Sequence, residues 1–405
     1  MPTQASQNRR VVSGMRPTGQ LHLGNYHGAL ANWIELQYRY ECFFFVADWH
    51  ALTTGYENTS EFRSNTNEVL IDWLAAGLNP SACTMFVQSR IPEHAELHLI
   101  LSMVTPISWL ERVPTYKDQI EQLKDKDLST YGFLGYPLLQ SADILMYRPE
   151  YVPVGEDQVA HVEITREVAR RFNNIYGLEP DFEAKVAGAV KRLGTRNASL
   201  YDELRRKFHE QGDAKSLEKA RAMVESAARL TVADRERLLG HLEGGGRAIL
   251  PEPSALLTRT PKVPGLDGRK MSKSYGNTIG LREDPASVAR KLKAMQTDPA
   301  RVRRTDPGDP DKCPVWDLHK IYSDESTQAW VQAGCRSAGI GCLDCKKPVI
   351  EAILGQLATI RERAREYEEN PDLVRGIVGE GCERAREAAR ATMAEVREAI
   401  GLEYR

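Results

Sequence analysis

The chain has 405 residues and a formal net charge of −2, and 41% of its residues are hydrophobic and 27% charged. This length predicts two or three domains, and the composition is typical of a soluble globular protein. No apolar run approaches the roughly 20 residues of a membrane span, which argues against contact with a membrane. Residues 1–10 are polar and no apolar signal-peptide core follows them, so the expected location is the cytoplasm. Because the charge is nearly balanced, any nucleic-acid contact must come from local basic patches.

Short apolar runs alternate with helical patterns through the first half of the chain. The runs are too short for helices and predict buried strands at residues 11–12, 42–47, 84–87 and 151–154. Apolar residues at helical spacing predict helices at residues 62–76, across much of 93–143, and from 159 to 172. Strands that alternate with helices predict a parallel sheet covered on both faces, which is a Rossmann-like α/β fold.

The composition changes twice further along the chain. Residues 178–248 are rich in Ala, Arg, Glu, Lys and Leu, and they predict an inserted helical hairpin or small bundle, with a continuation of the main domain as the alternative. Strand-like sequence returns at residues 255–263, and residues 285–405 are almost entirely helical in pattern. The predicted organisation is a catalytic domain in two parts, 1–177 and 249–284, with a helical insertion at 178–248 and a helical C-terminal domain at 285–405.

A glycine-containing turn at residues 13–25 joins the first predicted strand to a helix. Backbone N–H groups at the start of such a helix, aided by its dipole, form a site for phosphate. His22 and Asn25 are three residues apart, so both side chains can lie on one face of the first turn and donate to phosphate oxygens. Many proteins contain a strand, a glycine turn and a helix, so this segment alone does not establish a nucleotide site.

A second motif, Lys270-Met271-Ser272-Lys273-Ser274, lies between Gly268 and Gly276. Two lysines three residues apart in a glycine- and serine-rich loop can close on a triphosphate and stabilise the charge that develops as pyrophosphate leaves. A bare pair of lysines at this spacing is usually part of a solvated loop. The full pentapeptide favours the functional interpretation.

The two segments together resemble the paired signatures of class I aminoacyl-tRNA synthetases, His-Ile-Gly-His and Lys-Met-Ser-Lys-Ser. Asn25 replaces the second histidine, as is usual in the tryptophanyl-tRNA synthetases, and His22 keeps the first. The resemblance implies that His22, Asn25, Lys270 and Lys273 are catalytic. It also implies ATP contacts for the remaining signature residues, which are Arg16, Pro17, Thr18, Gly24, Met271, Ser272 and Ser274. Arg16 stands where many bacterial members have Gln.

Residues 136–145 and 154–163 are similar to segments of the tryptophanyl enzymes, and the first is also similar to the tyrosyl enzymes. By this resemblance Asp143 accepts the indole N–H, and Tyr136 and Gln158 bind the substrate α-ammonium group. The resemblance also places three residues against the ATP ribose: Gly155, Glu156 and Asp157. A buried carboxylate requires a donor, so an amino acid without the indole N–H would be rejected strongly. The alternative for Asp143 is a cap at a helix terminus.

Two more residues are candidates by resemblance. His50 follows the aromatic-rich strand at 42–47, at the carboxyl end where ligands bind in open α/β sheets. The resemblance places it beside the substrate indole, and a packed core histidine is the alternative. Val263 is a candidate for a backbone contact to adenine.

Four of the seven cysteines, Cys313, Cys335, Cys342 and Cys345, fall in one short window. In a reducing compartment such a cluster favours a metal site over disulfides, and the two-residue gap between the last two suits zinc or an iron–sulfur corner equally. The spacing resembles that of bacterial tryptophanyl-tRNA synthetases that carry a [4Fe–4S] cluster near the anticodon-binding region. This resemblance favours the cluster, with Zn²⁺ as the alternative.

Basic residues flank the cysteine window and form a candidate patch for nucleic-acid binding. They could meet tRNA phosphates or form a solvated basic face. The five residues are Arg301, Arg303, Arg304, Lys346 and Lys347.

The resemblance as a whole implies a homodimeric enzyme that joins L-tryptophan to tRNA(Trp). In its first step the carboxylate of tryptophan attacks the α-phosphate of ATP, with Mg²⁺ bridging the phosphates, and pyrophosphate leaves. In the second step a terminal hydroxyl of the tRNA takes the aminoacyl group. Two alternatives remain at this point: a tyrosyl-tRNA synthetase, and a non-charging paralogue that senses tryptophan or nucleotide or binds a protein partner.

Overall fold

The computed structural model describes residues 9–113, 129–155, 158–177, 181–257 and 262–403. It divides into two compact units, each assembled from separated stretches of the chain. Unit 1 contains Met1–Arg90, Pro153–Asp157 and Leu256–Arg384, and unit 2 contains Ile91–Val152, Gln158–Ala255 and Ala385–Arg405. None of the described helices is both long and apolar enough to cross a membrane.

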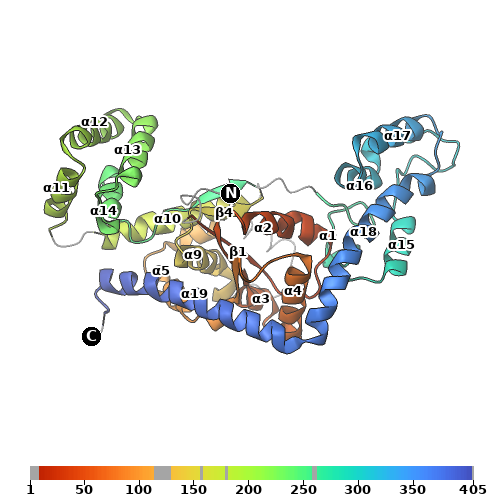
Figure 1. Cartoon of the computed structure of the whole chain (residues 1–405), viewed down its shortest axis with the longest axis horizontal. Helices are drawn as coiled ribbons and strands as arrows, with labels where there is room; N and C mark the ends of the chain where they lie inside the picture. The colour runs from red at the N-terminus through yellow and green to blue at the C-terminus, as the bar shows by residue number, and fades with distance from the viewer. Residues whose placement is uncertain (1–8, 114–128, 156–157, 178–180, 258–261, 404–405) are drawn as a thin grey trace. The chain divides into compact units, whose positions relative to one another are not determined.

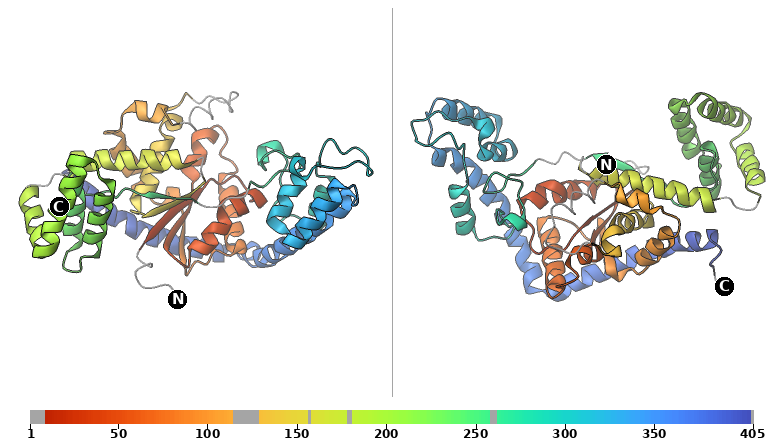
Figure 2. Two further views of the ribbon diagram at one scale, coloured as in Figure 1. Left: turned by 90° about the horizontal axis from the view of Figure 1, so that it is seen from above. Right: turned by 180° about the vertical axis from the view of Figure 1, so that it is seen from behind.

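Five strands form one sheet in the order β3-β2-β1-β4-β5, visible as arrows in Figure 2. Strand β1 pairs with β2 and β2 with β3, both in parallel, and Val12 lies opposite Phe43. The strands are β1 (Arg10–Met15), β2 (Glu41–Val46), β3 (Cys83–Val87), β4 (Tyr151–Val154) and β5 (Ser254–Leu257). The predicted Rossmann-like α/β fold is therefore confirmed. Strand β5 covers the start of the strand predicted at residues 255–263, and residues 258–261 of that prediction lie outside the described part.

Unit 1 begins with three parallel strands and the helices between them (Figure 1). Helical structure runs from Leu23 to Leu36 with a π-helical turn at Tyr26–Leu30. The elements of this part are α1 (Leu23–Asn25), α2 (Ala31–Leu36), α3 (Asp48–Gly55) and α4 (Phe62–Ala76). The Trp33 indole stacks on Phe44 with ring centroids 4.6 Å apart and meets Trp73 edge-on at 5.2 Å. These three buried rings join α2, β2 and α4 into one core.

The C-terminal part of unit 1 is helical, as predicted. Its helices are α15 (Pro285–Ala294), α16 (Pro314–Tyr322), α17 (Glu325–Arg336), α18 (Cys342–Glu369) and the first part of α19 (Pro371–Ala399). Asp284 caps α15 by accepting the Ser287 N–H, and Pro285 occupies the first turn, where a missing N–H costs nothing. Helix α18 packs along α4, so the C-terminal helices share a core with the strand-and-helix part of the same unit.

Unit 2 contains α5 (Glu93–Ser102), α6 (Ile107–Glu111), α8 (Tyr131–Leu134), α9 (Tyr136–Met146) and α10 (Val159–Tyr176). Helix α9 packs against both α5 and α10. Ser141 and Thr165 join α9 to α10 through a buried hydroxyl pair at 3.0 Å. The predicted helices in 93–143 and from residue 159 are present, apart from residues 114–128, which the structure does not describe.

The insertion is a bundle of α11 (Phe182–Arg192), α12 (Thr195–Gln211), α13 (Ala214–Ser226) and α14 (Val232–Leu242) (Figure 1). It has a hydrophobic core of its own, built around Val186, Tyr201, Val224 and Leu238. The sequence predicted a helical hairpin or small bundle here. The separate core favours the bundle as a distinct structural element, and its boundaries at 178 and 248 stay a prediction.

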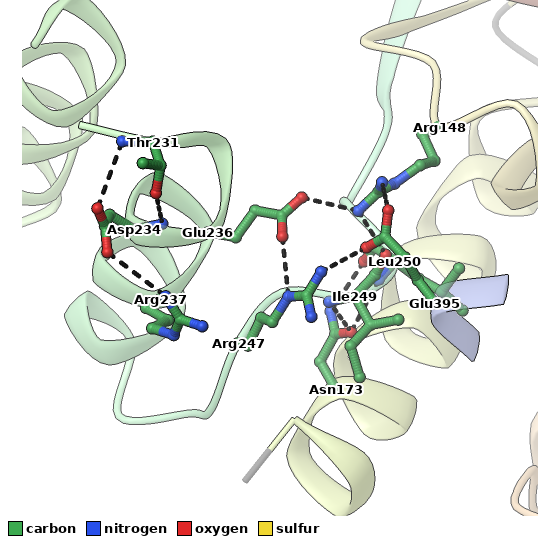
Figure 3. A network of polar contacts seen from close by, with 10 residues as sticks. All are labelled: Arg148, Asn173, Thr231, Asp234, Glu236, Arg237, Arg247, Ile249, Leu250 and Glu395. Atoms are coloured by element: carbon green, nitrogen blue, oxygen red, sulfur yellow. Dashed lines mark hydrogen bonds and ion pairs between the residues drawn. The ribbon is translucent and has the colours of Figure 1, made fainter. Parts of the chain in front are cut away.

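Four charged side chains fasten the insertion within unit 2 (Figure 3). Arg148 donates to Glu236 on α14 and to Glu395 on α19, both at 2.8 Å. Arg247, at the end of the insertion, donates to the same two carboxylates at 2.9 and 2.6 Å. The two arginines and two glutamates neutralise one another, so the network joins the turn after α9 to α14 and α19 without leaving one of the four charges unpaired.

Candidate functional site

The structure brings the two signature motifs together within unit 1. Nζ of Lys273 donates to the carbonyl oxygen of Thr18 at 2.5 Å. The segment after the lysine motif also pairs with the first signature, since the Leu23 N–H donates to the Ile279 carbonyl and the Leu281 N–H to that of Leu21. The two motifs, about 250 residues apart in the chain, therefore form one site.

The first signature positions His22 and Asn25 at the start of α1. Oδ1 of Asn25 accepts the His22 backbone N–H at 3.1 Å, which orients the amide so that its NH₂ group is the end available to a phosphate. Gly24 is required by the His22 ring, because a Cβ at residue 24 would lie 2.9 Å from the ring atoms Cε1 and Nδ1. His22 is buried, whereas the Lys270 and Lys273 side chains are exposed.

Burial and the positive charge of Lys273 lower the pKa of His22 to about 4. His22 is therefore a neutral hydrogen-bonding group at neutral pH. Burial also lowers the pKa of Lys273, while the nearby carboxylates of Asp72 and Glu68 oppose that shift.

Asn277 shapes the lysine loop and was not among the residues that the sequence pointed to. Its Oδ1 accepts the Ser272 N–H at 2.8 Å, and its Nδ2 donates to Asp267 at 2.7 Å and to the Lys270 carbonyl at 3.2 Å. Gly265 makes room for this amide, since a Cβ there would lie 2.1 Å from Nδ2. The side chain is 3% exposed, so it acts as an internal template for the loop.

A buried carboxylate on α4, that of Asp72, contacts both the first signature and the segment that follows the lysine motif. Asp72 accepts the Leu21 N–H at 2.5 Å and the Arg282 Nε–H at 2.6 Å. Arg282 also pairs with Glu68 and Glu368. Burial raises the pKa of Asp72 to about 6, against the opposing effects of Arg282 and the Leu21 N–H, so Asp72 is charged at neutral pH. A charged residue within the apolar stretch of α4 was the sequence signal that could have revealed it.

The remaining candidates of unit 1 lie at the carboxyl ends of its strands. His50 is buried in the first turn of α3, directly after β2. Val263 is buried, and its carbonyl accepts the Met271 N–H at 3.2 Å, so this backbone group already belongs to the lysine loop. Arg16 is half-buried after β1, and Gly155 follows β4. Glu156 and Asp157 lie outside the described residues.

The predicted tryptophan residues lie in unit 2. Asp143 is fully buried in the interior of α9, which excludes its alternative role as a cap at a helix end. Tyr136 begins the same helix, is 3% exposed, and has its ring 5.9 Å from that of His161. Gln158 precedes the first residue of α10.

A histidine absent from the sequence-based candidates contacts Asp143. Nδ1 of His94 on α5 lies 2.6 Å from Oδ1 of Asp143, and Nε2 lies 2.7 Å from the Tyr147 hydroxyl. All three side chains are 0% exposed. The only sequence signal was a histidine in a helix with an apolar pattern, which is common in protein cores.

The four clustered cysteines line one small cavity in unit 1, together with Asp298 and Arg301. Within the described ranges, no group of three or more His, Cys, Asp or Glu side chains is arranged to hold a metal ion. Nη1 of Arg301 lies 3.9 Å from Sγ of Cys335. Burial, with the neighbouring thiols, raises the pKa of Cys345 to about 12.

Two of the five basic residues beside the cysteines are internal. Nζ of Lys346 donates to the carbonyls of Lys293 and Met295 at 2.7 and 2.6 Å, and Lys346 is 4% exposed. Arg301 donates to the carbonyls of Arg304 and Ile340 and is also buried. Neither alternative considered from the sequence holds for these two, because their charges satisfy backbone oxygens. Arg303, Arg304 and Lys347 are exposed.

The sequence is similar to class I aminoacyl-tRNA synthetases along nearly its whole length. The family model "tRNA synthetases class I (W and Y)" matches residues 4–191 and 220–357, which is more than half of the chain. The break in the match falls inside the insertion. A tryptophan–tRNA ligase from Ralstonia nicotianae is 64% identical over 98% of this chain and 99% of its own length. One from Thermotoga maritima is 44% identical over 98% of this chain and 100% of its own length.

Solved structures agree with the sequence comparison. A tryptophanyl-tRNA synthetase from Campylobacter jejuni, crystallised with ADP and tryptophan, is similar with a TM-score of 0.72 at 28% identity. The match covers 97% of this chain and 100% of that one. The chain therefore belongs to the bacterial class I tryptophanyl-tRNA synthetases, and its activity is that of a tryptophan–tRNA ligase.

Proposed function

We propose that the ATP phosphates bind at the joined signature motifs, with His22, Asn25, Lys270 and Lys273 as the catalytic groups. The observation that carries the proposal is the Lys273–Thr18 contact, which brings the lysine loop onto the first signature. ATP would also contact Arg16, Pro17, Thr18, Gly24, Met271, Ser272 and Ser274, with Mg²⁺ bridging its phosphates. Gly155, Glu156 and Asp157 would face the ribose and the Val263 backbone the adenine. Neutral His22 and the Asn25 amide would donate to phosphate oxygens, while the lysines stabilise the charge on departing pyrophosphate.

The amino-acid substrate is proposed to bind with its indole N–H on Asp143 and its α-ammonium group on Tyr136 and Gln158, and His50 is proposed to contact the indole. The support is the complete burial of Asp143, because a carboxylate in such a place requires a donor. The tryptophan carboxylate then attacks the α-phosphorus, the bond to the bridging oxygen of pyrophosphate breaks, and a terminal hydroxyl of tRNA(Trp) subsequently displaces AMP. The protein contributes positioning and charge.

The neutral state of His22 can be tested by pH. Between about pH 5.5 and 8, kcat/KM for ATP is expected to show no inflection from His22, since its pKa of about 4 lies below this range and kcat/KM reports the free enzyme. His22→Asn should share the wild-type profile, and His22→Ala should lose activity by about 10²-fold, the effect of one lost donor. The measurement is tryptophan-dependent ATP–pyrophosphate exchange. An inflection near pH 6.5 that disappears in His22→Asn would contradict the assignment.

The template role of Asn277 gives another prediction. Asn277→Ala removes three hydrogen bonds that hold the lysine loop, so adenylate formation is expected to fall by about 10²-fold, as misplaced catalytic groups generally cause. Tryptophan affinity should stay within about twofold. Stopped-flow adenylate formation and equilibrium dialysis measure the two quantities. Asn370→Ala, at the exposed end of α18, is the control, and a wild-type rate in Asn277→Ala would overturn the role.

We also propose that Cys313, Cys335, Cys342 and Cys345 hold a [4Fe–4S] cluster. The support is that all four thiols line one small cavity. The resemblance of their spacing to that of cluster-carrying tryptophanyl-tRNA synthetases favours the cluster over a single zinc ion. Arg301 beside Cys335, and His319 with its Nε2 3.4 Å from Sγ of Cys345, are suitable hydrogen-bonding partners for cluster ligands. A cluster in this helical domain would stabilise it or shape a tRNA contact.

Chemical analysis separates the cluster from zinc. Protein purified without oxygen is expected to contain about four iron and four labile sulfide per chain. Cys342→Ser should lower both and reduce the melting temperature, while Cys83→Ala, on β3 outside the cavity, should retain them. One zinc per chain without sulfide would support the alternative metal and contradict the cluster.

The helical domain that contains the cysteines is the proposed anticodon-binding domain, and Arg303, Arg304 and Lys347 are its exposed basic residues. The proposed assembly is a homodimer in the cytoplasm, where thiols stay reduced.

A further inference from the structure

We infer that His94, supported by Tyr147, is a positioning residue that makes Asp143 selective for the indole N–H. The inference rests on the proposed contact between Asp143 and tryptophan. It goes further by assigning that selectivity to a chain of three buried side chains on α5 and α9.

The two contacts of the His94 ring are both matched when Nδ1 carries the proton. Nδ1 of His94 is 2.6 Å from Oδ1 of Asp143, and a carboxylate oxygen accepts, so Nδ1 carries a proton and donates. In the tautomer with its proton on Nδ1, Nε2 accepts from the Tyr147 hydroxyl at 2.7 Å. Each donor has an acceptor and no proton has to move. Because all three groups are fully buried, a single unmatched member would carry a full desolvation cost.

This arrangement has a consequence for substrate choice. A protonated Asp143 would present an O–H donor to the indole N–H. Two donors that face each other repel. The hydrogen bond from His94 favours the ionised carboxylate, which accepts only, and a carboxylate has lone pairs for His94 and an indole N–H together. His94 also fixes the side-chain rotation of Asp143, so the remaining acceptor direction is defined before substrate arrives.

Helix α19 holds the two helices that carry these residues. The Thr392 hydroxyl donates to the Met146 carbonyl at 2.7 Å, directly before Tyr147. Arg397 donates from Nε to Glu96 at 2.7 Å, one turn from the start of α5. Both ends of the chain of three side chains are therefore anchored within unit 2.

The test compares tryptophan with its benzothiophene analogue, in which sulfur replaces the indole N–H. In ATP–pyrophosphate exchange, His94→Ala is expected to raise KM for tryptophan by about tenfold or more and to reduce discrimination against the analogue by a similar factor, the effect of one charge-assisted hydrogen bond. KM for ATP should stay within about twofold. His94→Asn should restore much of the discrimination, because an amide N–H can take the place of Nδ1–H.

Tyr147→Phe keeps the ring and removes only the hydroxyl donor, so it tests the same chain if His94→Ala folds poorly; a smaller loss of discrimination is expected. His209→Asn replaces a hydrogen-bonded histidine elsewhere in unit 2 and should change nothing. Suppose that His94→Ala and Tyr147→Phe both keep full discrimination while Asp143→Ala loses it. That result would overturn the role of His94 and leave the proposed Asp143–indole contact standing. Full discrimination in Asp143→Ala would instead overturn the proposed indole contact and, with it, this inference.

Discussion

Lys273→Ala is expected to slow tryptophanyl-adenylate formation by about 10²–10³-fold, the usual effect of removing one group that stabilises developing charge. Tryptophan affinity should stay within about twofold. The reason is the position of Lys273, whose Nζ donates to the Thr18 carbonyl of the first signature. Binding of ATP would exchange that neutral acceptor for phosphate oxygens, and the interaction would strengthen as negative charge accumulates on pyrophosphate.

Rapid-quench measurement of adenylate formation gives the rate, and equilibrium dialysis with labelled tryptophan gives the affinity. Lys262→Ala removes another exposed lysine outside the signature and should keep the wild-type rate. A parallel loss of rate and tryptophan affinity in Lys273→Ala would contradict the assignment, because it would indicate a general structural effect and not a loss of transition-state stabilisation.

The sequence was sufficient to predict the sheet, the helical C-terminal part and the pairing of the two signatures. These features depend on local patterns: apolar runs for strands, helical spacing for α4 and α10, and two recognisable motifs. The contact between Lys273 and Thr18 joins two motifs that the resemblance had already paired, although about 250 residues separate them.

Residues that act through other residues could not be found in this way. Asn277 lies three positions after the lysine motif, and its importance appears only when its three hydrogen bonds are seen. His94 is 49 positions from Asp143, and nothing local to either residue links them. The sequence also could not show that Arg301 and Lys346 turn inward, since burial of a charge depends on which backbone carbonyls the fold leaves available.

Asp143→Asn is expected to reduce kcat/KM for tryptophan by about 10²-fold, although the substitution is nearly isosteric. A carboxylate accepts through both oxygens, whereas an amide has one acceptor oxygen and one NH₂ donor. In the fully buried position of Asp143, one oxygen already faces Nδ1 of His94 at 2.6 Å. While His94 donates from Nδ1, the amide can satisfy His94 or the indole N–H but not both, and the unmatched group carries the cost of burial.

The analogue series makes this prediction specific to the N–H group. The wild-type enzyme should reject the benzothiophene analogue by roughly 10⁴-fold, as sites built around a buried hydrogen bond do. Asp143→Ala should accept the two amino acids at rates within about tenfold of each other, since neither then leaves a carboxylate unmatched. Steady-state exchange assays with purified amino acids measure both ratios, and His209→Asn, elsewhere in unit 2, provides a control. If Asp143→Asn kept wild-type efficiency, the indole N–H would have to meet another acceptor, because an amide that remains bonded to His94 has no second oxygen to offer.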